Sequence, residues 1–116
     1  IEMKSKVLKY LIPFAENFTL DLPKGSKIVR IDVDQGNPYL WALVNIDEAE
    51  INTYHFSCGK TGGLIEHDNE LLFIDTYAIF IQMELMLYVF LNKVSTPTGD
   101  IIASKFIEHV NNCWRG

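Results

Sequence analysis

The sequence has few cysteines, no long apolar run and few basic residues in its middle, and each shortage excludes a class of protein. Two cysteines, Cys58 and Cys113, are fewer than a disulfide-held secreted scaffold normally carries. The sequence does not decide whether they form a disulfide bond, and we favour free thiols in a reducing cytoplasm. The longest apolar stretch, residues 71–91, is broken by polar side chains, so no membrane span is expected. The first residues lack the apolar run and cleavage pattern of a secretory signal.

The charge distribution argues against general nucleic-acid binding. The chain has 15 acidic and 10 basic residues, a formal net charge of −5. Residues 31–75 contain nine of the acids and a single base, Lys60. Phosphate contacts need clustered lysine and arginine, which this segment lacks. The acidic middle is therefore either a solvated face or a surface for a basic partner.

Alternation of apolar and polar residues predicts strands along most of the chain. The seven predicted strands are residues 6–12, 18–22, 28–34, 39–44, 51–57, 71–81 and 83–91. Gln35–Pro38 is the strongest turn signal, and it predicts a hairpin. Trp41 lies in a run that is apolar on both faces, so we expect it in the core. The turn between the last two strands is expected near Gln82–Leu85.

The last part of the chain has a different period. Residues 95–99 form a break in composition, and Ile102, Phe106 and Val110 then recur at steps of four. This spacing predicts a C-terminal amphipathic helix over residues 98–113. The fold class expected is mainly β (α+β): one domain, residues 1–116, with a β body over 1–94. We expect a compact antiparallel β-sandwich or open barrel of about seven strands, closed by that helix.

A glycine-rich loop is the first candidate binding site. Gly59, Lys60, Thr61 and Gly62 follow a predicted strand, and exposed backbone amides in such a loop can hold an anionic ligand. A phosphate-binding P-loop would need a longer glycine spacing and a helix after it, and neither is present. The sequence thus disfavours ATP or GTP hydrolysis.

Four residues have the chemistry of zinc ligands. His55 and Cys58 are three apart, and His109 and Cys113 are four apart on the predicted helix. The two halves lie far apart in sequence, and surface or core positions explain each of them. The Cys–His pairings also lack a local signature of nucleophilic catalysis. We therefore assign no metal, no cofactor and no catalytic residue.

The order of four segments resembles a known family. The segments are Leu22–Ile28, Val33–Val44, the loop Gly59–Gly63 and the strand Leu87–Phe90. Together they are similar to a small β-domain family of unknown function that is common in bacteriophage genomes. The loop has one residue inserted, and the family's Trp and His in the last strand are replaced. The resemblance covers roughly residues 5–92 and implies a phage or prophage origin, a compact β-domain and no catalytic residues.

Three functions are compatible with the sequence. The first is a phage accessory protein that acts by non-enzymatic binding in the host cytoplasm, as an anti-defence (anti-CRISPR-like) inhibitor does. The acids Asp47, Glu48 and Glu50 would then face a basic surface on a host protein. The alternative is a small-molecule binder that sequesters an anionic nucleotide signal with the glycine-rich loop. The third is a metal-dependent or cysteine hydrolase. The sequence leaves open whether the protein forms homo-oligomers.

Overall fold

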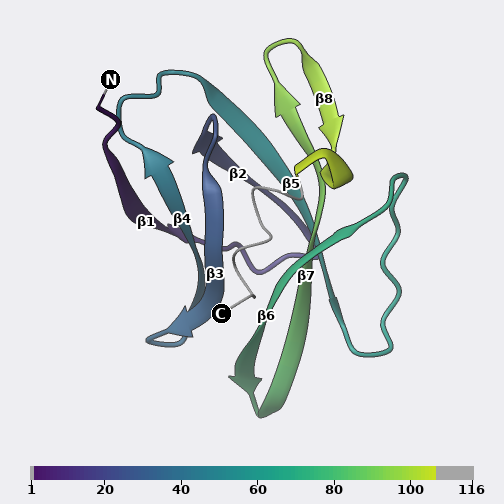
Figure 1. The fold of residues 1–116 in the computed structure, drawn as a ribbon. Coiled ribbons are helices and arrows are strands. Elements are labelled where there is room, and N and C mark those ends of the chain that lie inside the picture. Colours follow the sequence, from purple (N-terminus) through teal and green to yellow (C-terminus); the bar gives the residue numbers. More distant parts are fainter. Residues whose placement is uncertain (1, 107–116) are drawn as a thin grey trace.

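In the computed structural model, residues 2–106 are described, and Ile1 and residues 107–116 are not (Figure 1). The described residues form eight strands and one short 3-10 helix. In chain order these are β1 (Ser5–Leu11), β2 (Asn17–Pro23), β3 (Lys27–Asp34), β4 (Asn37–Asn45), β5 (Ile51–Lys60), β6 (Leu72–Ile81), β7 (Met83–Thr96), β8 (Gly99–Ile102) and η1 (Ala103–Phe106). All seven strands predicted from alternation are present, and β7 runs further than expected.

Two antiparallel sheets face each other (Figure 1). The first has three strands in the order β1-β4-β3, and the second has the order β2-β5-β7-β6. Strands β6 and β8 pair with the same edge of β7, β6 along residues 83–91 and β8 along residues 93–96. Strand β5 pairs with the other edge. At one side the backbone N–H of Ile31 on β3 donates to the carboxylate of Asp75 on β6 at 2.9 Å, which joins the two sheets. The predicted mainly-β, antiparallel fold is confirmed, and its strands form two sheets.

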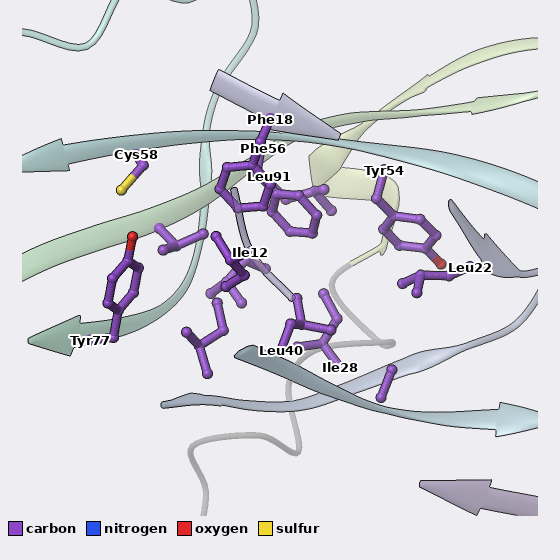
Figure 2. Packing of buried hydrophobic residues seen from close by; sticks show 14 of the residues in the cluster. Ile12, Phe18, Leu22, Ile28, Leu40, Tyr54, Phe56, Cys58, Tyr77 and Leu91 are labelled. Atoms are coloured by element: carbon purple, nitrogen blue, oxygen red, sulfur yellow. The ribbon is translucent and has the colours of Figure 1, made fainter. Parts of the chain in front are cut away.

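The core lies between the sheets and is filled by alternate residues of each strand (Figure 2). On β4, Leu40, Ala42 and Val44 are buried, whereas Trp41 and Leu43, which alternate with them, face outward. Tyr54 and Phe56 of β5 are also buried, and the Phe56 ring stacks on that of Phe18 with centroids 4.9 Å apart. Each large apolar side chain buried in this way stabilises the fold by about 1.5–3 kcal/mol, so the shared core holds the sheets together.

Two hairpins turn at residues with positive φ. The predicted β3–β4 hairpin is confirmed, and Gln35 (φ 52°) and Gly36 (φ 85°) form its turn. Positive φ at both central residues defines a type I′ turn, whose twist matches that of the flanking strands. The β6–β7 hairpin turns at Gln82 (φ 62°), inside the segment expected for it.

The C-terminal amphipathic helix predicted over residues 98–113 is wrong in its described part. Gly99–Ile102 is the strand β8, paired antiparallel with the end of β7, and only Ala103–Phe106 is helical, as a single 3-10 turn. The remainder of the predicted helix lies outside the described residues. The β body thus extends to residue 102 rather than 94. No helix within residues 2–106 is long and apolar enough to cross a membrane.

Contacts with β7 explain why this segment is a strand. Asp100 accepts a hydrogen bond from the Ser95 hydroxyl at 2.7 Å and pairs with the Lys93 ammonium at 3.0 Å. The β-branched Ile101 and Ile102 that follow favour extended backbone. A spacing of four between apolar residues is compatible with a helix, but in this segment pairing with β7 makes residues 99–102 a strand.

The expectation that Trp41 belongs to the core is also wrong. Its side chain lies half-buried on the outer face of β4. The Arg30 guanidinium stacks over the indole at 4.4 Å, Lys9 lies 5.6 Å from its centroid, and the Tyr39 ring is 6.0 Å away. Basic side chains from both neighbouring strands thus cover the indole, which was expected in the core.

Candidate functional site

The acidic loop, residues 46–50, connects β4 to β5 and is held by its own side chains. Asn45 accepts a hydrogen bond from the backbone N–H of Asp47 at 3.0 Å, and the Glu48 carboxylate accepts one from the N–H of Glu50 at 3.0 Å. The Glu50 carboxylate lies 3.9 Å from the Lys24 ammonium. Asp47 is exposed, whereas Glu48 and Glu50 are half-buried.

The glycine loop, residues 59–63, lies where β5 ends. The N–H of Gly63 donates to the carbonyl of Lys60 at 3.0 Å, which closes a tight turn, and Gly62 has a φ of 80°. The Thr61 hydroxyl donates to the Tyr88 hydroxyl at 3.1 Å. Because residues 61–71 contain no helix, the loop lacks the helix N-terminus on which a P-loop depends.

The two candidate segments do not meet. They flank β5 (Ile51–Lys60), whose ten residues separate them by about 30 Å at ordinary strand rise. Figure 1 shows the two loops at opposite ends of this strand. A ligand or a small interface that uses one loop therefore leaves the other free.

A cavity of about 600 Å³ lies beside the glycine loop, and we call it the end cavity. Four separate segments build it: the β1–β2 connection, the end of β5 with the loop that follows, β6 and β7. The lining residues are Phe14, Ala15, Glu16, Cys58, Gly59, Lys60, Gly63, Leu64, Tyr77 and Leu87. The lining is mainly apolar, with one basic and one acidic side chain, and volume and lining match those of small-molecule sites.

The inner wall of the end cavity carries one polar pair. Figure 2 shows the Tyr77 hydroxyl directed toward the sulfur of Cys58, a free and buried thiol. Burial raises the pKa of Cys58, and the hydrogen bond with Tyr77 opposes that rise. Burial also raises the pKa of Tyr77, and the neighbouring Cys58 raises it further. At neutral pH both groups are uncharged, so the pair offers a weak donor and acceptor but no nucleophilic thiolate.

A second, polar cavity of about 350 Å³ lies on the outer face of the second sheet, under residues 66–69. His55 lines it and its Nε2 lies 2.8 Å from the Ser95 hydroxyl, which donates to Asp100. Burial lowers the pKa of His55, with the Lys93 ammonium as a second cause. Since the serine proton points to the aspartate, His55 is not placed to act as its general base.

The weak zinc candidates are separated. His55 lies on the outer face of β5 and Cys58 on the inner face, so they point away from each other. His109 and Cys113 lie outside the described residues. Within residues 2–106, no group of three or more His, Cys, Asp or Glu side chains could hold a metal ion.

The end cavity combines residues that the sequence indicated with residues that it did not. Gly59 and Lys60 of the predicted loop line it, whereas Thr61 and Gly62 do not. The sequence did not indicate Phe14 and Leu64 as site residues. In the structure both line the cavity and are exposed, at 67% and 96%. The one local signal for them is an apolar side chain placed inside a Pro- or Gly-marked connection.

Comparisons with known proteins give a family but no activity. No curated protein and no solved structure matches the chain. A family model described as a domain of unknown function, DUF7352, matches residues 3–100, which extend from before β1 into β8. A family without a known function was expected from the resemblance, and nothing in the match concerns a phage origin. Because the matched region spans nearly all of the strands, the chain belongs to the DUF7352 family.

Proposed function

We propose that this protein is a non-enzymatic binding module that holds a small, largely apolar ligand in the end cavity. The observation that carries the proposal is the cavity of about 600 Å³ with its exposed apolar rim at Phe14 and Leu64. Large apolar side chains left in water at the rim of a hollow are typical of ligand-binding sites. The protonated Cys58–Tyr77 pair supplies the polar contact that orients a ligand.

The chemistry of the lining favours an apolar ligand over a nucleotide. Lys60 is the one basic side chain among the lining residues, so the several charges of a nucleotide's phosphates would meet a single cation. The N–H of Gly63 is already bonded to the carbonyl of Lys60, so the turn offers little to a phosphate. A nucleotide's phosphates require several such donors.

A fluorescence titration with anilinonaphthalene sulfonate tests the proposal. The dye should bind saturably with stoichiometry near one, and Ala15→Trp, which fills the mouth of the end cavity, should weaken binding at least tenfold. Ala49→Trp is the matched control, since Ala49 is an exposed residue of the acidic loop, and it should bind the dye as the parent does. Equal binding by both variants contradicts the proposal. Displacement of the dye by a mononucleotide but not by decanoate would assign a nucleotide instead.

The second candidate is binding of a basic host protein through the acidic loop, and one observation favours it. Ile46, the first residue of the loop, and Ile51, which follows the loop, are about half exposed, at 47% and 49%. Exposed apolar side chains with a polar, charged rim around them are common at protein interfaces. A phage accessory or anti-defence role in the host cytoplasm would be the setting for such a surface.

Charge reversal tests the second candidate. Changing Asp47, Glu48 and Glu50 to Lys should slow association with a recovered host partner, with a smaller effect at high salt. The matched control reverses the three acids at positions 66, 68 and 70, which gives the same change in net charge. If both triple variants associate equally slowly, net charge and not the acidic loop is responsible.

A further inference from the structure

An apolar stripe leads out of the end cavity along one face of the β6–β7 hairpin. In the register of this hairpin, Tyr77 pairs with Leu87, then Ile79 with Leu85, and finally Ile81 with Met83. These six side chains face the same side, because alternate residues of paired strands share a face. The stripe therefore continues the cavity wall without a break.

Exposure rises steadily along the stripe. Tyr77 and Leu87 at the cavity are nearly buried, at 4% and 8%, and the middle pair packs partly against the core. Ile81 and Met83 at the turn are 54% and 70% exposed. From the first pair to the last is about 14 Å at ordinary strand rise. Figure 1 shows the end of the hairpin extending past the rest of the second sheet.

The stripe carries no charged side chain, and a base stands at its beginning. The one acid near the turn, Glu84, pairs with Phe80 and so lies on the opposite face. Lys60, the last residue of β5, pairs directly with Leu87 at the start of the stripe. Lys60 also lines the end cavity, so the base lies where the cavity and the stripe meet.

We infer that the ligand is a linear aliphatic chain with an acidic head group, a fatty-acid type of molecule. This inference rests on the proposed function, since it names the class of ligand for the same cavity. The chain lies along the cavity wall and the stripe toward Ile81 and Met83, and the carboxylate lies at Lys60. A narrow apolar path with charge at one end matches a linear amphiphile, whereas a compact ligand would leave Ile81 and Met83 in water.

Displacement of anilinonaphthalene sulfonate by a series of acids tests the inference. From hexanoate through octanoate and decanoate to dodecanoate, affinity should rise by up to about fourfold for each added CH₂. Adamantane carboxylate, of comparable carbon content but compact, should bind more weakly than decanoate. Lys60→Gln should weaken decanoate binding and leave the binding of decanol unchanged.

Variants of the hairpin locate the chain. The double change Ile81→Ser with Met83→Ser should leave hexanoate affinity unchanged and remove most of the gain from longer chains. Phe80→Ser is the matched control: Phe80 is 78% exposed on the opposite face of the same hairpin. It should retain the full chain-length dependence. All three positions are exposed, so the fold should survive each change.

Each contrary result has its own meaning. If the parent fails to bind the dye, the proposed function itself is wrong. If the dye binds but affinity is independent of chain length, or the double variant behaves as Phe80→Ser does, the inference is overturned while the cavity remains a binding site. A stable dimer in light scattering that the double variant dissociates would also overturn it, since a second copy would then cover the stripe.

Discussion

At the scale of single residues, Trp41 and its neighbour Leu40 show that an apolar run does not reveal which of its two faces is buried. Both belong to an apolar run on β4, but Leu40 is fully buried and Trp41 lies under Arg30 on the outer face. No feature of the run itself distinguishes its two faces, because tryptophan suits a core and a cation-covered surface equally well. Only the register with β3 and β1 decides between them.

The two residues should differ in their contribution to stability. Trp41→Ala should lower the free energy of unfolding by about 1–2 kcal/mol, through lost stacking with Arg30 and partial burial. Leu40→Ala should cost about 2–5 kcal/mol, because it leaves a cavity between the sheets. Urea unfolding of both variants measures the difference. A larger loss for Trp41→Ala than for Leu40→Ala would return the indole to the core.

At the scale of elements, the turn between β3 and β4 was readable from the sequence and makes a sharp prediction. A Cβ added at Gly36 would touch nothing within 4 Å, so Gly36→Ala tests backbone conformation alone. At its φ of 85° the variant should lose about 1–2 kcal/mol of stability. Gln35→Asn should act in the opposite direction, because asparagine tolerates positive φ better than glutamine. Thermal unfolding of both variants that gave shifts of the same sign would exclude the type I′ turn.

Strand β8, in contrast, could not be predicted from the sequence. Ile101 and Ile102 fit a short strand as well as one turn of an amphipathic helix, and the break at residues 95–99 suits either outcome. The deciding contacts join Asp100 to Ser95 and Lys93. The seven other strands have longer alternation, and for them local pattern and tertiary pairing agree.

At the scale of the whole molecule, burial of ionisable groups in one core sets the response to alkaline pH. Burial raises the pKa of Tyr54 to about 12, and it also raises the pKa of Tyr77 and of Cys58. The unfolded chain loses these protons at a lower pH than the folded protein does. Above the unfolded pKa, the unfolded state therefore binds fewer protons, and rising pH favours unfolding.

Stability should accordingly fall in strong alkali. Between about pH 10 and 12, Tyr54 alone should lower the free energy of unfolding by about 1.4 kcal/mol per pH unit. Tyr54→Phe should reduce that slope, although it changes the stability at neutral pH as well. Urea unfolding at a series of pH values measures both slopes. Identical slopes for parent and variant would show that Tyr54 ionises freely in the folded protein.

The candidate site was predictable only in part, for a reason that concerns the whole molecule. Gly59 and Lys60 stood out because glycine and lysine mark a loop. Leu87 and Tyr77 lie within predicted strands, and both are buried. The cavity beside them is completed by residues 14–16, which come from the distant β1–β2 connection. Spaces between segments remote in sequence leave no local pattern.

A methyl-resolved NMR titration with decanoate shows where an aliphatic acid binds. Leu64 and Leu87 line the end cavity and Ile81 ends the stripe, so their methyl signals should shift together and saturate. Leu11 and Leu43 are exposed on the outer face of the first sheet and should not move. Saturable shifts confined to the first group are the predicted result. Shifts at Leu11 and Leu43, or none anywhere at high decanoate concentration, would contradict binding in the end cavity and along the stripe.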